Sequence, residues 1–280
     1  MRWNIVTDSS CDLPPVDNKD EQVRVSSVPF IISVGEKDFV DDAALDTDTM
    51  LKAMEQCKSA SHTSCPTPQS WIEEFEKADQ NIAITISSQL SGSMNSAKIA
   101  RDMVLERCPN KKIAVLDSRS TGPELALCVE KVLEMIRAGQ DFEHVVSSAK
   151  LALKHTHIAF ALSSFDNLIK NGRMSRIAGF IARKLSMWGI GVGSEEGVID
   201  IKGKTRGSLA ALSMLIDDMT VRGFRGGKVV ISHCQNLSLA EKLRNKISEF
   251  WPQCEVRILA ARGLCSYYAE RSGLILAYES

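Results

Sequence analysis

The sequence predicts an α/β fold of two domains, with a mostly parallel sheet flanked by helices in the first and a mixed sheet with helices in the second. Short apolar segments of strand length alternate with amphipathic segments of helix length, a pattern typical of parallel sheets covered by helices. The chain has 280 residues, more than one average domain. The apolar segments 190–192 and 198–202 flank a polar turn and indicate an antiparallel hairpin in the second half. We place the domain boundary near His155, giving domains of 1–155 and 156–280.

The N-terminal half contains the clearest alternation, and its first strand is expected at 5–7. Trp71, Ile72 and Phe75 recur at the spacing of one helix face. Pro68 precedes them, and proline fits the first turn of a helix. The further strands expected here are 23–34, 82–86 and 113–116, and the expected helices are 47–57, 69–78, 94–107, 123–138 and 142–154.

The C-terminal half begins with an expected strand at 158–162, which leads through a short helix to the polar turn 171–176. A helix is expected directly after this turn, at 177–185. The remaining expected helices are 208–221, 238–250 and one before the last strand, and the remaining strands are 228–232, 255–259 and 274–278.

The charge balance excludes several classes of protein. The chain carries 34 basic and 35 acidic residues, a net charge of −1, and 44% of its residues are hydrophobic. Disorder requires lower hydrophobicity and a larger net charge, and attraction to nucleic acid or to an anionic membrane requires a basic surface. The ligand must therefore be recognised by local groups.

The N-terminus enters a strand-like segment without a signal-peptide core, and no apolar run approaches the roughly 20 residues that span a bilayer. The eight cysteines form no Cys-x-x-Cys pair, so we expect reduced thiols and a cytoplasmic protein. His155 and His157 have no third ligand nearby, and we expect no metal site.

Hydroxyl-rich turns follow several of the expected strands. Ligands of open α/β sheets bind beyond the carboxyl ends of the strands, so these turns are the first candidates for a site. Ser91 and Ser93, separated by Gly92, could bind a carboxylate or phosphate at the start of a helix. The alternative is that both serines only cap that helix. A further hydroxyl cluster, 63–68, is expected in a loop before a helix.

Enzyme motifs are mostly lacking. The sequence contains neither the Gly-x-Ser-x-Gly motif of hydrolases nor a Walker motif. The glycines of 189–193 do not fit a dinucleotide-binding loop, because they precede a hairpin instead of a helix. His233 could act as a general base, but a histidine without a paired nucleophile is more often structural. Arg173, Arg176, Arg183 and Lys184 form a basic cluster that is either a solvated surface or a contact for phosphate or a partner.

Taken together, several motifs resemble the DegV family of fatty-acid-binding proteins, which have the EDD fold. The resemblance extends over essentially the whole chain. The motifs that carry it are Thr7-Asp8-Ser9-Ser10-Cys11-Asp12-Leu13-Pro14, Thr63-Ser64-Cys65-Pro66-Thr67-Pro68, Ser87-Ser88-Gln89-Leu90-Ser91-Gly92-Ser93, Asp117-Ser118 and Asn171-Gly172-Arg173-Met174-Ser175.

The resemblance implies that one long-chain fatty acid, such as palmitate, is buried between the two domains, with no other cofactor and no catalytic residue. Its carboxylate would be bound by Thr63 and Ser91, with Ser64 and Ser93 as neighbours. Some members of the family are carriers for a separate ATP-dependent fatty-acid kinase. Arg173 and Arg206 would then face the kinase or the acyl phosphate, and stable membrane insertion is not expected.

This chain departs from the family pattern at several positions, including Cys65 where the family usually has Gln. The histidine that family members usually place near the carboxylate is absent, and Tyr268 is its nearest substitute by position. A tyrosine hydroxyl can still donate to the carboxylate. Two alternatives stay open: an enzyme for a small anionic substrate with His233 or Asp8 as base, and a regulatory protein whose lipid only completes the fold.

Overall fold

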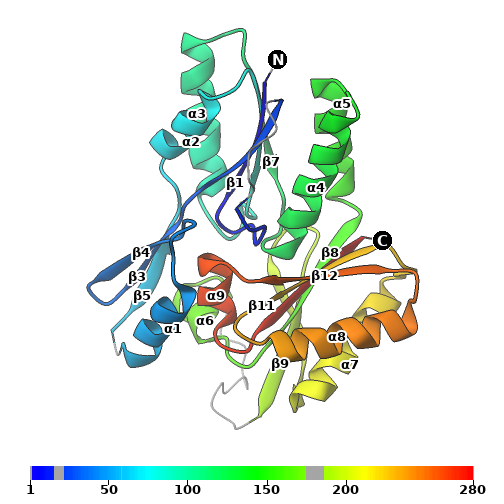
Figure 1. The fold of residues 1–280 in the computed structure, drawn as a ribbon. Coiled ribbons are helices and arrows are strands. Elements are labelled where there is room, and N and C mark those ends of the chain that lie inside the picture. Colours follow the sequence, from blue (N-terminus) through cyan, green and yellow to red (C-terminus); the bar gives the residue numbers. More distant parts are fainter. Residues whose placement is uncertain (1, 16–21, 58, 175–185, 280) are drawn as a thin grey trace.

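The structure of the protein, a computed structural model, describes residues 2–15, 22–57, 59–174 and 186–279. The described residues form three sheets surrounded by helices, as Figure 1 shows. The predicted α/β class, with one parallel and one mixed sheet, is confirmed. The domain boundary near His155 stays a prediction.

The first sheet is parallel and has the strand order β2-β1-β6-β7. Helices cover both of its faces because its strands are apolar on both sides: Val6 of β1 packs toward α2 and α3, and Ile5 packs toward α4 and α5. This sheet and its helices consist of β1 (Trp3–Asp8), β2 (Val23–Val28), α2 (Pro68–Phe75), β6 (Gln80–Thr85), α3 (Ser93–Arg107), β7 (Lys112–Asp117), α4 (Pro123–Arg137) and α5 (Phe142–Ala152).

The expectation of a single strand over 23–34 is wrong. The chain leaves the parallel sheet after β2 at Pro29, which has no N–H to donate to a ladder. Phe30 N instead donates to Ser9 Oγ at 3.0 Å. The chain then enters an antiparallel sheet of order β4-β3-β5, made of β3 (Ile31–Val34), β4 (Lys37–Val40) and β5 (Ser61–Ser64), with α1 (Thr47–Gln56) before β5.

The third sheet is mixed and has the order β10-β9-β8-β13-β11-β12. The predicted hairpin is confirmed, because β9 and β10 pair antiparallel from Met187–Arg206 to Gly193–Ile199. Helices α7 and α8 cover its outer face. The elements are β8 (Thr156–Leu162), α6 (Asp166–Lys170), β9 (Met187–Gly193), β10 (Ile199–Arg206), α7 (Ser208–Val221), β11 (Lys228–His233), α8 (Leu237–Phe250), β12 (Glu255–Ala260), α9 (Gly263–Ala269) and β13 (Leu274–Glu279).

The predicted helices agree with the observed ones to within a few residues, and Pro68 begins α2 as expected. The helix expected at 177–185, together with Arg176, Arg183 and Lys184 of the basic cluster, lies outside the described residues. None of the helices within the described ranges has the length and apolarity that crossing a bilayer requires.

The parallel and mixed sheets are joined through shared cores. Leu127 of α4 packs with Val230 of β11 and Ala277 of β13. Helix α9 lies beside α1 and the antiparallel sheet, as seen in the lower half of Figure 1. These contacts bring the carboxyl ends of β1, β6 and β7 toward β8, β9 and α9, and the candidate site lies between them.

Candidate functional site

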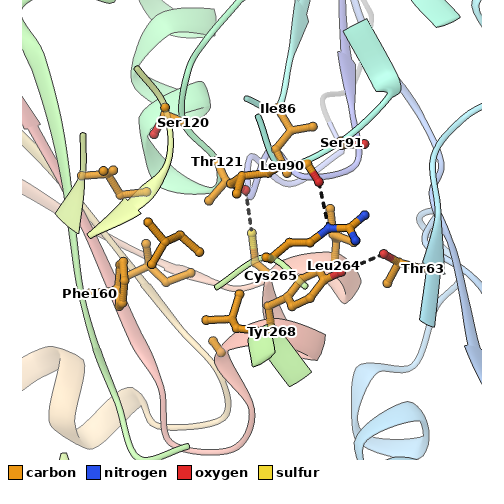
Figure 2. A pocket seen from close by; sticks show the side chains of 18 of the residues that line it. Thr63, Ile86, Leu90, Ser91, Ser120, Thr121, Phe160, Leu264, Cys265 and Tyr268 are labelled. Atoms are coloured by element: carbon orange, nitrogen blue, oxygen red, sulfur yellow. Dashed lines mark hydrogen bonds between the residues drawn. The ribbon is translucent and has the colours of Figure 1, made fainter. Parts of the chain in front are cut away.

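A cavity of about 400 Å³ lies where the three sheets meet (Figure 2). A cavity of this size suits a small organic ligand. Its walls are mainly apolar side chains, and its polar side chains come from β5, the Ser87–Ser93 turn, the segment 119–121 after β7, Arg173 and α9. The lining residues are Phe30, Thr63, Ser64, Cys65, Ile86, Leu90, Ser91, Gly92, Arg119, Ser120, Thr121, Ile158, Phe160, Leu162, Leu168, Arg173, Gly193, Gly197, Val198, Ile199, Leu264, Cys265, Tyr268, Ala269 and Ile275.

One end of the cavity is polar. Thr63 Oγ1 and the Tyr268 hydroxyl lie 2.9 Å apart, although the two residues are 205 positions apart in the chain. Arg173 is fixed beside them, because its Nε donates to Leu90 O at 2.9 Å, as the dashed line in Figure 2 shows. The exposed Ser64 lines the same end. The polar end of the cavity therefore reaches the protein surface.

The hydroxyls of Thr63 and Tyr268 can still donate a hydrogen bond to a ligand while they are hydrogen-bonded to each other. Each hydroxyl carries one proton and two acceptor sites, so one proton joins the pair and the other can be aimed elsewhere. Burial raises the pKa of Tyr268, and the phenol therefore stays protonated at neutral pH. Together with the charge of Arg173, this arrangement suits an anionic head group.

Ser91 lies at the same end, in the turn that precedes α3. Its Oγ accepts from Ser93 N at 3.2 Å, so the serine satisfies one N–H of the first turn of the helix. The cap residue itself is Gly92, which makes no side-chain cap hydrogen bond. Ser91 thus helps to cap the helix, as the alternative interpretation predicted, but its side chain also lines the cavity.

Ser93 has a different environment from Ser91. Its side chain is buried, and its hydroxyl donates to Asp8 Oδ2 at 2.6 Å. Asp8 also accepts from Ser10 Oγ at 2.5 Å and from Ile86 N at 3.0 Å. Burial raises the pKa of Asp8, and these hydrogen bonds oppose the shift. Asp8 and Ser93 therefore fix the start of α3 from beneath, and neither of them lines the cavity.

Apart from the segment 119–121, the rest of the cavity wall is mainly apolar, and strand β8 contributes three of its large side chains. Side chains alternate across a strand, and Ile158, Phe160 and Leu162 face the cavity while Ala159 and Ala161 pack under α7. Leu264 of α9 completes the wall. These wall residues were not predicted from the sequence, although the alternation of large residues with alanine in 158–162 was a signal for them.

The turn of the β9–β10 hairpin borders the side of the cavity away from Thr63. Ser87 Oγ donates to Gly197 O at 2.6 Å, and Arg119 donates to Glu195 O at 3.0 Å. The hairpin of the mixed sheet is thereby attached to the carboxyl ends of the parallel sheet.

The structure brings together Thr63, Ser64, Ser91, Tyr268 and Arg173 of the residues named from the sequence. It places Arg206 elsewhere: this residue is exposed at the end of β10 and does not line the cavity. Thr63 and Ser64 lie on strand β5, so the expectation of a loop at this position is wrong.

Neither base considered for the enzyme alternative lines the cavity. Asp8 is buried beneath the start of α3, and His233 Nδ1 accepts from Asn236 N at 3.1 Å next to α8. In the described part of the chain, no cluster of three His, Cys, Asp or Glu side chains could bind a metal, and His157 packs on the ring of Tyr278. All eight cysteines are free thiols.

Comparison with known proteins relates this arrangement to a family. The sequence model of a family described as "Uncharacterised protein, DegV family" matches residues 2–277. A DegV domain-containing protein of Streptococcus pyogenes serotype M1 is 38% identical over 279 residues, a match that covers 100% of both chains.

Two solved structures are similar along the whole chain. The Streptococcus pneumoniae Fatty Acid Kinase (Fak) B3 protein loaded with linoleic acid has 38% identity and a TM-score of 0.96, covering 100% of this chain and 99% of that one. A DegV family protein from Eubacterium eligens loaded with heptadecanoic acid has 36% identity and a TM-score of 0.95, covering 99% of each. Because the family match spans nearly all residues and these relatives share the complete fold, the chain belongs to the DegV family.

Proposed function

We propose that the protein binds one long-chain fatty acid in the cavity, with the carboxylate at the polar end and the acyl chain along the apolar wall. The observation that carries this proposal is a mainly apolar lining with Thr63, Ser91, Tyr268 and Arg173 gathered at one end, while the segment 119–121 lines the cavity elsewhere. The fatty acids in the two similar solved structures support the same choice of ligand.

The acyl chain supplies most of the affinity in this arrangement. Burying a chain of about 16 carbons contributes up to roughly 10 kcal/mol, at about 0.8 kcal/mol per methylene. Loss of translational freedom and ordering of the chain offset a large part of that gain. The hydroxyls of Thr63, Ser91 and Tyr268 then orient the head group more than they increase the affinity.

As a carrier, the protein presents the carboxylate to a separate fatty-acid kinase. Two observations support this role: the polar end reaches the surface at Ser64, and a relative of 38% identity is named as a Fatty Acid Kinase B3 protein. Arg173 is placed to contact the carboxylate or its phosphorylated form. Arg206, exposed and outside the lining, would contact the kinase instead of the ligand.

Organic extraction of the purified protein followed by mass spectrometry tests the binding function. We expect one fatty acid of roughly 14 to 18 carbons per protein molecule, because each buried methylene of the acyl chain adds affinity. Combining Thr63→Val with Ser91→Ala is expected to weaken binding of palmitic acid. The matched control is Ser213→Ala, which removes an exposed hydroxyl on α7.

An extract without fatty acid, from protein that also fails to bind added palmitic acid, would contradict the binding function. The carrier role has its own test. Arg206→Ala should reduce acyl-phosphate formation in the presence of a fatty-acid kinase and ATP, while the Kd for palmitic acid stays unchanged.

A further inference from the structure

The glycine-rich segment 189–193, which does not fit a dinucleotide-binding loop, forms most of strand β9. Because side chains alternate along a strand, its three glycines share one face. Ile190 and Val192 occupy the other face and pack in the core beneath α7. The glycine face is directed toward the cavity, which Gly193 lines. From position 189 to position 193, strand β9 therefore presents no side chain on this face.

The neighbouring strand β8 covers this glycine face with large side chains. Phe160 pairs with Gly191 across the two strands. A Cβ atom at position 191 would lie 2.3 Å from Cζ of Phe160, and one at position 193 would lie 2.6 Å from Cγ2 of Ile158. Both large side chains thus lie in the space that β9 leaves free, and both form part of the cavity wall.

The backbone does not require glycine at position 191. Gly191 is not among the residues of positive φ, so an alanine can adopt its conformation. The requirement comes mainly from the Phe160 ring, which would have to move from 2.3 Å to the 3.4 Å of an ordinary contact, by at least about 1.1 Å. The other close atom is the backbone oxygen of Asp200, at 3.1 Å from the added Cβ. Because β9 lies on one side of the ring, the movement is directed into the cavity. In Figure 2, Phe160 lies on the opposite side of the pocket from Thr63.

We propose that Gly191 sets the length of the acyl chain that the cavity accepts, by letting the Phe160 ring lie against β9. The inference rests on the proposed function and narrows its ligand to acyl chains long enough for their ends to reach Phe160. An aromatic ring over a strand glycine also stabilises sheets. That structural role alone predicts a loss of stability in Gly191→Ala but no change in chain-length preference.

The test compares the Kd values of myristic and stearic acid, which share a head group and differ by four methylenes. Delipidated wild type and Gly191→Ala are titrated with each acid. We expect the ratio of the stearic to the myristic Kd to rise about tenfold or more in Gly191→Ala, because each methylene kept out of the cavity costs about fourfold in affinity. Adding Phe160→Leu to Gly191→Ala should return the ratio toward that of the wild type.

Gly203→Ala is the matched control. This glycine lies in the adjacent strand β10, and its Cβ atom would meet Met214 Cε at 2.9 Å, outside the cavity lining. We expect its Kd ratio to equal that of the wild type.

An unchanged Kd ratio in folded Gly191→Ala would overturn the inference and leave the proposed function intact. If Gly191→Ala does not fold, Phe160→Leu alone decides. Its wider cavity should lower the ratio of the stearic to the myristic Kd, and an unchanged ratio would overturn the inference. If the wild type binds neither acid, the proposed function fails and the inference fails with it.

Discussion

The Tyr268 hydroxyl can be removed with little other change, since Tyr268→Phe keeps the ring that lines the cavity and its edge contact with Tyr267 at 4.8 Å. In the ligand-free protein the substitution breaks the 2.9 Å bond to Thr63. In the proposed complex with a fatty acid, it would remove a donor to the carboxylate. The expected result is weaker binding of palmitic acid with little loss of stability.

The size of the expected change in Kd follows from the difference between the hydrogen bond to the carboxylate and the hydrogen bond to Thr63. A hydrogen bond to a charged group contributes about 1.5–3 kcal/mol and a neutral one about 0.5–1.5 kcal/mol. Their difference is about 1–2 kcal/mol, which corresponds to a Kd about 5 to 30 times higher.

Titration of delipidated Tyr268→Phe and wild type with palmitic acid measures this change. Methyl palmitate is the control ligand, because its head group is uncharged and should show a smaller loss. Thermal unfolding checks that the variant is folded. A Kd equal to that of the wild type, in a variant with the wild-type melting temperature, would refute the assignment of Tyr268 to the carboxylate.

Three further predictions concern buried groups around the site. Burial raises the pKa of Asp12 from 3.8 to about 6, which means that the folded protein binds the carboxyl proton more tightly than the unfolded chain does. The stabilisation by the protonated Asp12 is therefore fully present below pH 4 and is lost as the pH rises through 6. Relative to Asp12→Asn, the wild type should lose about 3 kcal/mol of unfolding free energy between about pH 4 and pH 7, as measured by urea denaturation. If the difference in unfolding free energy between the two proteins does not depend on pH, this pKa is contradicted. Gly197→Ala should lower the melting temperature by more than Gly207→Ala does. The backbone strain is the same, because φ is +85° at Gly197 and +86° at Gly207. Of these two positions, only Gly197 has a neighbour that an added Cβ would meet, Ser87 Oγ at 2.4 Å. Asp8→Ala leaves the Ser93 hydroxyl and a buried N–H without their acceptor and should cost about 3 kcal/mol or more in chemical denaturation, and a loss below about 1 kcal/mol would argue against this role.

The alternation of strands and helices was readable from the sequence because each segment buries a continuous apolar face. Helix α7 is an example, since its predicted bounds equal the observed ones. The break at Pro29 was not predicted, because the apolar pattern of 23–34 continues across it. The two strands become distinct in the folded protein, because β2 pairs with β1 in the parallel sheet and β3 pairs with β4 in the antiparallel sheet.

The candidate site was predictable to a smaller extent. Hydroxyl-rich turns after strands indicated Ser91, and the family resemblance added Thr63 and Tyr268. The different environments of Ser91 and Ser93 could not be predicted, because they depend on the buried Asp8 carboxylate, which lies 85 positions from Ser93.

The sequence by itself determined the fold class, the absence of known enzyme motifs and the family resemblance, because these depend on local pattern and on motif order. Tertiary structure alone decided which side chains share the cavity. Thr63 and Tyr268 lie 205 positions apart, and the Phe160 ring rests on a glycine of the next strand. The first contact results from the packing of α9 beside the antiparallel sheet, and the second from the pairing of two strands within the mixed sheet. No periodicity along the chain encodes the distance between residues that meet only when the chain folds.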